Sequence, residues 1–420
     1  TADHGVVVDN HDGTFTITPA ANYSGAVALS YTVSDGNGGS LAASQGFALA
    51  AVNDAPSALA LSNSTIAEQR PNNTLVGTLI PTDVDNASGF TYTLLDSAGG
   101  RFYLNSATGQ VFVGNGSLLD YEASTHYTID VQVKDAAGAT YHQQLTINLT
   151  NVVENQSYAG TAAANVFTAP TEDNWTVDGK GGADVITTLS GNDTIFAGAG
   201  NDTVHTGGGN DVIYFTGAGG GFDAIDGGAG NDTILVNAVN TVIGLSSISG
   251  IETISSGGFA GVKIQGTTLD DVLDFSGATL VGITSINGGT GNDTLTGSAG
   301  DDHIDGGLGT DILAGGAGND TFVFTATGHT KNGSAFADHI TDFALGDLID
   351  LSTIDANGSI AGNQAFEFIG TAAFTGLGQL RIGMDNGHVA IFGNTAGNAN
   401  AEFEIILDNN HAIQAADFIL

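Results

Sequence analysis

A nine-residue pattern most constrains what the middle of this chain can fold into. The template G-G-x-G-x-D-x-U-x, in which U is apolar, recurs ten times in two runs, with intervals of nine residues apart from one of twelve in the first run. The template aspartates are Asp184, Asp193, Asp202, Asp211, Asp223 and Asp232 in the first run, and Asp293, Asp302, Asp311 and Asp320 in the second. A repeat of fixed period predicts a solenoid, in which each unit stacks on its neighbour.

Each unit predicts a short strand followed by a turn. The x-U-x triplet directs one apolar side chain into the stack, and six glycine-rich residues turn the chain. Glycine is needed there because larger side chains avoid positive φ. Two units make one coil of eighteen residues, so aspartates eighteen apart lie above one another. The predicted pairs are Asp184 with Asp202, Asp193 with Asp211, Asp293 with Asp311, Asp302 with Asp320 and, across a three-residue insertion near Gly219, Asp202 with Asp223 and Asp211 with Asp232.

Stacked carboxylates repel one another, so the repeat needs a counter-ion. The chain has 45 Asp and Glu against 7 Lys and Arg, a formal net charge of -38 that attracts cations. Facing carboxylates and inward carbonyls form an all-oxygen cage, which suits Ca²⁺ better than zinc, copper or the strictly octahedral Mg²⁺. With affinities of roughly 10⁻⁴ to 10⁻³ M and about tenfold ion excess, each site adds roughly 1.4 kcal/mol. We therefore expect the repeat region to be disordered without calcium and folded with it.

Composition excludes several classes of function. An acidic surface repels nucleic acid and anionic lipid headgroups, and the absence of cysteine excludes disulfides and thiolate metal sites. No window approaches about 18 consecutive apolar residues, so no membrane span is predicted. HExxH, GxSxG, P-loop and paired Cys or His motifs are all absent, and the chain is not predicted to be an enzyme. Thr1 follows neither an initiating Met nor a leader, which favours a cut within a longer polypeptide.

The composition and residue patterning of the sequence predict an all-β chain of four parts. Alternating runs such as TFTIT (14–18) and YTIDVQV (127–133) indicate half-buried strands of antiparallel β-sandwiches, and VNDAP (52–56) marks a linker. A parallel β-roll follows, and the phenylalanines beyond Asp320 indicate a β-rich cap for its open end. Residues 236–287 are expected to continue the stack without the aspartate position. The predicted parts are a partial sandwich (1–55), a complete sandwich (56–156), the roll (157–325) and the C-terminal cap (326–420).

The repeats resemble a known family. GGAGNDTIL (227–235) and GGTGNDTLT (288–296) fit every position of the nonapeptide of RTX (repeats-in-toxin) proteins. The resemblance implies a calcium-binding β-roll.

The C-terminal part carries a second resemblance. Residues 322–351, FVFTATGHTKNGSAFADHITDFALGDLIDL, are similar to the C-terminal region of serralysin-type secreted proteins, and the likeness continues to the terminal DFIL. It implies a cap on the roll and an uncleaved signal for type I secretion machinery, with Asp417 followed by apolar residues. Asp338, eighteen residues after Asp320, is expected to close one more site, with Asp342 contributing.

The sandwich part resembles cadherin-like repeats. TIAE (65–68), DVDN (83–86), LDYE (119–122) and VQVKDAAG (131–138) occur in that family's order. The resemblance implies two calcium sites, one from Glu68, Asp120 and Glu122 with Glu154, and the other from Asp83 and Asp85 with Asn53 and Asp54. DGTFTITPAANYSG and YTVSDGNGG, within residues 1–53, resemble instead the second half of bacterial Ig-like repeats.

These observations predict the calcium-binding C-terminal region of a secreted RTX adhesin or cell-surface protein of a Gram-negative bacterium. The sandwiches would act as an extender, and the roll would fold outside the cell after type I secretion. A cell-surface, glycan or protein ligand is expected, but not its identity. The main alternative is the secretion and folding module of a protease, lipase or polysaccharide-modifying enzyme. A β-helix lyase or epimerase and a surface-layer protein also remain open.

Overall fold

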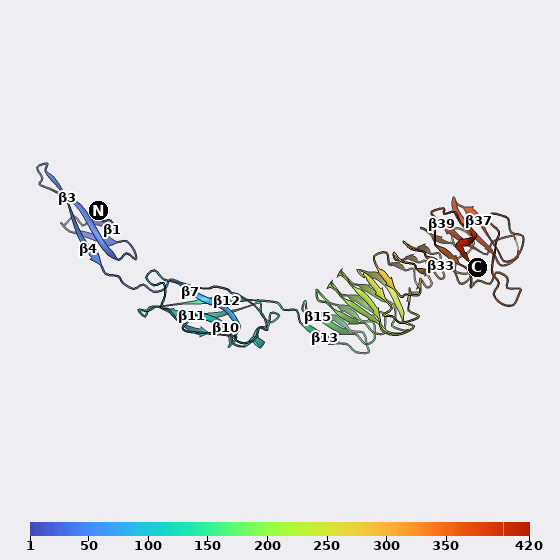
Figure 1. Cartoon of the computed structure of the whole chain (residues 1–420), viewed down its shortest axis with the longest axis horizontal. Helices are drawn as coiled ribbons and strands as arrows, with labels where there is room; N and C mark the ends of the chain where they lie inside the picture. The colour runs from blue at the N-terminus through green and yellow to red at the C-terminus, as the bar shows by residue number, and fades with distance from the viewer. Residues whose placement is uncertain (398) are drawn as a thin grey trace. The chain divides into compact units, whose positions relative to one another are not determined.

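The structure is a computed structural model that describes residues 1–397 and 399–420 (Figure 1). It divides into two compact units, Thr1–Val152 and Val153–Leu420. The predicted all-β fold class is confirmed, because the described residues form strands β1 to β40 and two short 3₁₀ turns, η1 (Gly116–Leu118) and η2 (Ala415–Asp417). No helix among these residues has the length and apolar character that a membrane span requires.

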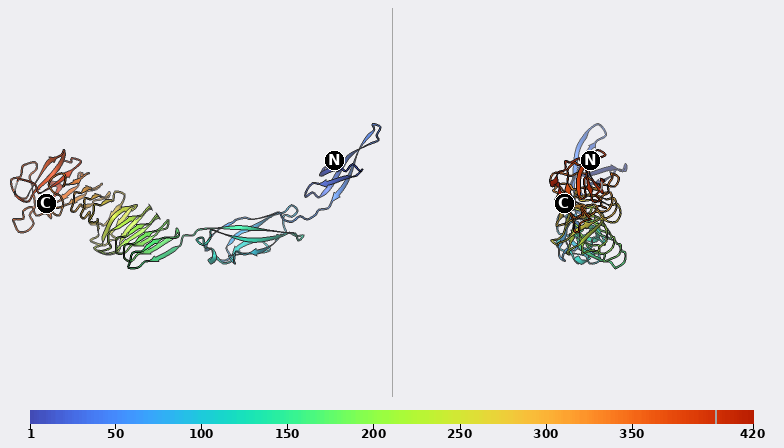
Figure 2. Two further views of the ribbon diagram at one scale, coloured as in Figure 1. Left: turned by 180° about the vertical axis from the view of Figure 1, so that it is seen from behind. Right: turned by 90° about the vertical axis from the view of Figure 1, so that its right-hand side faces the viewer.

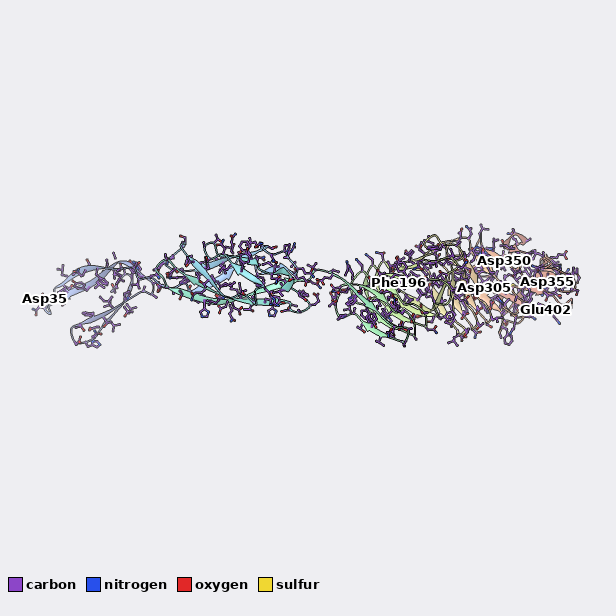
Figure 3. All side chains as sticks on the ribbon, turned by 90° about the horizontal axis from the view of Figure 1, so that it is seen from below. Asp35, Phe196, Asp305, Asp350, Asp355 and Glu402 are labelled. Carbon is purple, nitrogen blue, oxygen red and sulfur yellow. The ribbon has the colours of Figure 1, made fainter. Side chains whose placement is uncertain are left out.

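The first fifty residues form two antiparallel hairpins. Strands β1 (Gly5–Asp9) and β2 (Phe15–Pro19) pair with each other, and β3 (Gly25–Ser34) pairs with β4 (Ser40–Leu49). The turn before β4 is held by Asp35, whose Oδ1 accepts the N–H groups of Asn37 and Gly39 (Figure 3). Val27 is buried, whereas Phe15 and Tyr31 are 62% and 50% exposed, so these hairpins enclose little core.

Residues 58–150 form a sandwich of two four-stranded sheets. Alternation decides which side chains enter it: in β11 the residues Ile129, Val131 and Val133 are fully buried and their neighbours are not. The first sheet contains β5 (Ala58–Leu61), β7 (Leu75–Thr82), β10 (Gln110–Val113) and β9 (Phe102–Leu104), and the second contains β6 (Thr65–Ala67), β12 (Thr140–Thr150), β11 (His126–Lys134) and β8 (Thr91–Asp96).

The second unit begins with a stack of parallel strands that form two facing sheets (Figures 1 and 2). The first sheet contains β13 (Asn155–Ala159), β15 (Asn174–Asp178), β17 (Thr194–Phe196), β20 (Val212–Phe215), β23 (Thr233–Val236), β25 (Thr253–Ser255) and β28 (Thr279–Val281). The facing sheet contains β14 (Val166–Thr168), β16 (Val185–Thr187), β18 (Thr203–His205), β21 (Asp223–Asp226), β24 (Val242–Ser249), β26 (Lys263–Gln265), β29 (Ile286–Asn287), β31 (His303–Asp305), β33 (Thr321–Val323), β35 (Leu348–Asp350) and β40 (Phe418–Ile419).

A third sheet joins the later coils to the C-terminal cap. It contains β27 (Val272–Asp274), β30 (Thr294–Thr296), β32 (Ile312–Ala314), β34 (Asp338–Ile340), β39 (Phe403–Leu407), β38 (His388–Asn394), β37 (Gln379–Asp385) and β36 (Glu367–Phe368). A small pair of turn strands, β19 (Gly208–Gly209) and β22 (Ala229–Gly230), lies between successive coils. Because β27 to β34 are parallel and β37 to β39 antiparallel, this sheet marks the change from roll to cap.

The coil length follows the spacing of the repeat. Ile186 of β16 pairs with Val204, eighteen residues later, and Val204 pairs with Ile225 across the three-residue insertion. A three-residue strand directs one apolar side chain inward, as Ile195 and Val204 show at 0% exposure, and the longer β20 directs two, Ile213 and Phe215. Each such burial contributes roughly 1.5–3 kcal/mol. Strands β24 to β29 carry the stack through residues 236–287.

The cap closes the roll with strands taken from the end of the chain. Strand β39 adds to β34 and β40 adds to β35, both in parallel. Aromatic side chains fill the space behind them: Phe322, Phe343 and Phe403 are at most 1% exposed, and the rings of Phe322 and Phe343 lie 6.1 Å apart. The last coils are therefore covered by the chain's own C-terminal strands.

Candidate metal centres

The template aspartates stack along the roll with one aspartate per coil, and each such column of carboxylates is called a ladder. The backbone N–H of each aspartate donates to Oδ1 of the aspartate one coil later, which brings their carboxylates together in the predicted pairs. These bonds run from Asp184 to Asp202 (2.7 Å), Asp193 to Asp211 (2.7 Å), Asp202 to Asp223 (2.9 Å), Asp211 to Asp232 (2.8 Å), Asp293 to Asp311 (2.8 Å) and Asp302 to Asp320 (2.9 Å).

The second carboxylate oxygen of most of these residues has no hydrogen-bond donor. Oδ2 is buried and without a hydrogen-bond partner in Asp184, Asp193, Asp202, Asp211, Asp232, Asp293, Asp311 and Asp338. A buried polar atom without a partner is unfavourable, and a buried unpaired charge more so. A cation at each level would remove this penalty, so the residues present fit a metal ion.

Turn glycines shape the space beside these oxygens. A Cβ on Gly288 would lie 2.4 Å from Asp293 Oδ2 and 2.5 Å from the carbonyl oxygen of Gly306 in the next coil. At Gly179 the corresponding distances are 2.6 Å to Asp184 Oδ2 and 2.4 Å to the carbonyl oxygen of Ala197. The glycines thus leave room where carboxylate and carbonyl oxygens of successive coils converge. A donor set made only of oxygens is the one that Ca²⁺ prefers.

Burial also shifts the protonation of the ladders. It raises the pKa of Asp211, Asp311 and Asp320 to about 6, and that of Asp223 and Asp293 to about 7. Burial raises the pKa of Asp193, Asp202, Asp232 and Asp302 as well. The stack without a counter-ion therefore disfavours the ionised carboxylates, and a bound cation would reverse that preference.

The predicted position of Asp338 is wrong. Asp338 does not stack on Asp320; its Oδ1 accepts the N–H of Asp311 at 2.8 Å, and Asp347 accepts the N–H of Asp320 at 3.0 Å. The reason is the loop at 324–337, which lengthens this half-coil by nine residues, so that eighteen residues after Asp320 the chain has completed only half a coil. Burial raises the pKa of Asp338 to about 8.

Asp342 has a different role from the ladder aspartates. Its two carboxylate oxygens accept the N–H groups of Gly315 and Gly316, both at 2.9 Å. It therefore fixes the turn before Asp320. Asp342 as a metal ligand stays a prediction.

The sequence analysis missed several members of the ladders. Glu252 accepts the N–H of Asp232 at 2.6 Å, and Asp271 donates its own N–H to Asp293 at 2.8 Å. The expectation that residues 236–287 drop the acidic position is therefore wrong at these two places. The template position was hidden because only one template glycine precedes each residue, Gly250 before Glu252 and Gly266 before Asp271.

In the sandwich, the structure brings together one predicted set of acids. Ligand atoms of Glu68, Asp120 and Glu122 all lie within 4.8 Å of one another. Glu68 is 2% exposed, and its two oxygens accept the N–H groups of Tyr121 at 2.6 Å and Val152 at 2.8 Å. This cluster can accept a cation, because one ligand atom from each of three carboxylates meets there. Glu154 belongs to the second unit, where its N–H donates to Asp173, and its role as a ligand stays a prediction.

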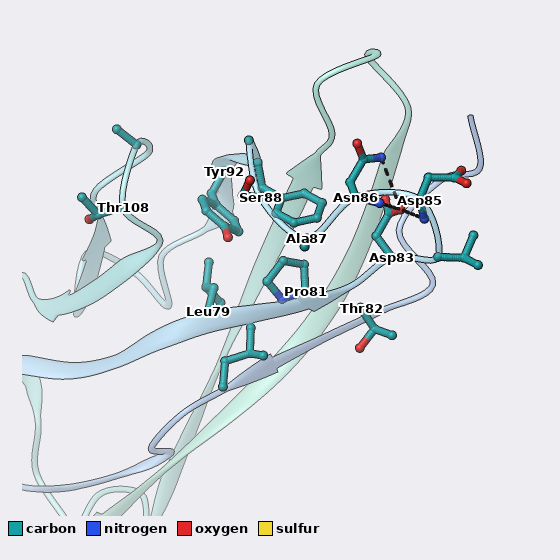
Figure 4. Close-up of a pocket in the computed structure, with 15 residues that line it drawn as sticks. Leu79, Pro81, Thr82, Asp83, Asp85, Asn86, Ala87, Ser88, Tyr92 and Thr108 are labelled. Atoms are coloured by element: carbon teal, nitrogen blue, oxygen red, sulfur yellow. Dashed lines mark hydrogen bonds between the residues drawn. The ribbon is translucent and has the colours of Figure 1, made fainter. Parts of the chain in front are cut away.

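The other predicted set gathers around the linker residues. Asp83 Oδ1 accepts the N–H groups of Asp85 and Asn86, while its buried Oδ2 has no hydrogen-bond partner (Figure 4). Asp54 donates its N–H to Asp85 Oδ2 at 2.6 Å. The predicted set missed Asp135, whose Oδ2 accepts Asn53 Nδ2 at 2.5 Å. That hydrogen bond is the main cause that lowers the pKa of Asp135.

Family models match three parts of the chain. The RTX calcium-binding nonapeptide repeat (4 copies) matches residues 178–213, 218–243 and 287–322. A cadherin domain matches residues 62–150, and a cadherin-like domain matches residues 1–50, where the sequence resembled Ig-like repeats. These matches identify calcium as the ion of the repeats. No curated protein matches the chain.

Solved structures resemble separate parts of the chain. Protocadherin gamma B7 extracellular cadherin domains 1–4 share 23% identity over 36% of this chain and 40% of that one, with a TM-score of 0.25. The AlgE6R3 subunit of the Azotobacter vinelandii mannuronan C5-epimerase shares 25% identity over 41% of this chain and 81% of that one, also with a TM-score of 0.25. Such TM-scores carry no inference about function, and the chain spans less than half of the protocadherin structure.

Proposed function

We propose that this chain, which contains RTX calcium-binding nonapeptide repeats and cadherin-like domains, is the C-terminal region of a secreted bacterial adhesin or cell-surface protein. The observation that carries the calcium part is the series of buried, unpaired Oδ2 atoms along the ladders. It is an extracellular, calcium-binding, non-enzymatic module. Export by type I secretion from a Gram-negative cell and a surface or glycan ligand belong to the same proposal.

The mechanism is folding coupled to ion binding. Bound Ca²⁺ would supply the positive charge that the stacked carboxylates lack. The chain's own part is to place the oxygens: the aspartate N–H groups fix each Oδ1, and the turn glycines leave room beside Oδ2. In low calcium the charged carboxylates of a ladder repel one another. The strands, many of which have one core residue, are too short to hold the coil without the ion. Calcium outside the cell would thus turn an exportable chain into a folded one.

The C-terminal strands support the direction of folding. Strands β39 and β40 complete the two sheets at the end of the roll, and Phe403 and Phe418 are buried there. Since the C-terminus of a type I substrate leaves the cell first, its folding would cover the roll and oppose backward movement. The cadherin-like domains, with their acidic clusters, would extend the molecule from its partner.

The test is a calcium titration of the full chain. Circular dichroism and the fluorescence of Trp175, the single tryptophan, should change cooperatively between micromolar and millimolar calcium, and chelator should reverse the change. Magnesium at equal concentration is the control and should not replace calcium. Unchanged β-structure in the roll after chelation would refute coupled folding.

Secretion and adhesion need separate tests. Residues 326–420 fused to a reporter should direct its export from a cell with a type I transporter, whereas a reporter fused to residues 57–155 should stay inside. Retention of both reporters would contradict the secretion route. Binding of the calcium-loaded full chain to bacterial or host surfaces, lost with chelator, would support adhesion over the tail of an enzyme.

A further inference from the structure

In two aspartates of the ladders, Oδ2 accepts both the N–H and the hydroxyl of one turn residue. Asp302 Oδ2 accepts both the N–H of Ser298 at 2.6 Å and its hydroxyl at 2.9 Å. Asp271 Oδ2 accepts the N–H of Thr267 at 2.6 Å and its hydroxyl at 2.9 Å. Both side chains are buried, yet neither has the unpaired Oδ2 found elsewhere in the ladders. At these two aspartates, protein donors therefore occupy the oxygen that is unpaired in residues such as Asp293 and Asp311.

The difference starts at the second residue of each turn. Gly289 and Gly307 hold this position before Asp293 and Asp311, with φ of +108° and +94°, and there Oδ2 has no partner. Thr267 and Ser298 hold it before Asp271 and Asp302, and neither is among the described residues with positive φ. A side chain disfavours the left-handed conformation that glycine adopts freely. The hydroxyl is the distinguishing donor, because Leu189 holds the same position before Asp193 without positive φ and Asp193 Oδ2 still has no partner.

We propose that Thr267 and Ser298 replace calcium at these two levels. Each supplies two hydrogen-bond donors to a buried carboxylate, which removes the need for a cation beside that Oδ2. The inference rests on the proposed calcium binding and narrows it, because fewer ions bind than the ten template aspartates suggest. Asp302, a predicted ligand, is thereby an ion-independent member of the ladder.

The positions of the two levels give them a structural role. Asp271 begins the ladder that continues through Asp293 and Asp311, and Asp302 begins the one that continues through Asp320. Both ladders of the second run thus start from a level that needs no ion. This run can begin to fold at the turns that contain Thr267 and Ser298, because hydrogen bonds hold them. Calcium then binds at the later aspartates of each ladder, whose turns have glycine at this position.

The experiment compares Ser298→Gly, Ser298→Thr and the wild type as full chains. Calcium per chain is measured by equilibrium dialysis and metal analysis, with chelator-treated samples followed by circular dichroism. Ser298→Gly restores the template glycine and should bind one more calcium per chain than the wild type. Ser298→Thr keeps both the N–H and the hydroxyl donor, as Thr267 does in its own turn, so its stoichiometry should equal that of the wild type.

A serine in another turn provides the matched control. Ser190 lies in the turn before Asp193, and no described hydrogen bond joins its hydroxyl to that aspartate, so Ser190→Gly should leave the stoichiometry unchanged. Wild-type binding with no gain in Ser298→Gly would overturn the inference while leaving the proposed function intact. A wild type that binds no calcium would overturn both. An equal gain in Ser298→Thr would also contradict it, since both donors are then still present.

Discussion

The sandwich and the roll differ in how often the chain itself satisfies a buried carboxylate. In the sandwich, Glu68 and Asp135 are buried and backbone N–H groups or an asparagine amide occupy both oxygens of each, whereas Asp83 Oδ2 is left without a partner. In the roll, aspartates such as Asp211 and Asp311 accept one N–H and leave the other oxygen buried and unpaired. A domain in which most buried carboxylates accept hydrogen bonds from its own chain can fold before an ion binds. A domain in which most buried carboxylates keep an unpaired oxygen must fold together with the ion.

The hydrophobic cores of the sandwich and the roll also differ in how many residues each strand contributes. The sandwich encloses a cluster in which each long strand contributes several residues, such as Val131 and Val133 of β11. A roll strand such as β17 contributes mainly Ile195, with one residue facing inward in three. A single roll strand therefore buries too little apolar surface to offset the entropy of its own ordering, and it depends on the coils stacked on either side of it. The ion stabilises that stacking.

The largest expected effect is the response to chelator. Removing calcium from the full chain should unfold the repeats between Asp184 and Asp320 and leave the sandwich at 58–150 folded. Hydrogen exchange with mass spectrometry would show protection lost in β16 to β33 and retained in β11 and β12. Equal loss of protection in both regions would break the comparison, because the sandwich would then depend on the ion as well.

The next effect comes from removing a carboxylate of the sandwich. Glu68→Ala leaves the N–H groups of Tyr121 and Val152 without acceptors, and each lost bond to a charged acceptor costs about 1.5–3 kcal/mol. Thermal unfolding in chelator should show this loss, because the sandwich needs Glu68 with or without calcium. Asp12→Ala, at an exposed turn of the first hairpin, is the control. No change in the melting of Glu68→Ala would contradict the role assigned to the buried carboxylate.

A smaller effect is expected from a single ladder aspartate. Asp211→Asn keeps an acceptor for the N–H of Asp193 but removes the charge at one level. The calcium-loaded roll should lose about 1.4 kcal/mol at tenfold ion excess, and the calcium midpoint should rise. Asp226→Asn, on an outward strand position, is the matched control. If both variants titrate like the wild type, the ladder charge is not what the ion requires.

The sequence predicted the regular part of the roll because the spacing of the repeat alone determines the length of each coil. Nine-residue spacing sets the coil, and the pairing of Asp193 with Asp211 follows from it without knowledge of the rest. The spacing failed at Asp338, where the loop at 324–337 lengthens a half-coil without leaving a trace in the aspartate interval. Asp271 was missed because the sequence template requires glycines before the aspartate. A ladder requires only a carboxylate at the matching position of the coil.

In the sandwich, order along the chain predicted which acids meet, but not how they are satisfied. TIAE and LDYE are far apart in sequence, and their resemblance to cadherin-like repeats placed Glu68 beside Asp120 and Glu122, which the structure brings together. Asp135 was missed because its partner, Asn53, lies in the linker and only the folded domain reveals the contact. Contacts between distant residues that lack a repeat or a motif are beyond what a pattern specifies.

The smallest effect is a pH dependence whose sign depends on the ion. In the metal-free roll burial raises the pKa of Asp223 and Asp293 to about 7 and of Asp338 to about 8, against about 3.9 in the unfolded chain. The folded state then holds more protons than the unfolded one, so its stability falls as pH rises through 6 to 8. In chelator, residual β-structure should therefore be greater at pH 5 than at pH 8.

With calcium the dependence should reverse, because protons compete with the ion for the same carboxylates. The calcium midpoint, read from Trp175 fluorescence, should fall as pH rises from 5 to 8. Asp338→Asn removes the group with the largest rise in pKa and should flatten the metal-free dependence, whereas Asp35→Asn, in the first hairpin, should not. Metal-free structure that increases with pH would contradict the burial of unpaired carboxylates and, with it, the contrast between the roll and the sandwich.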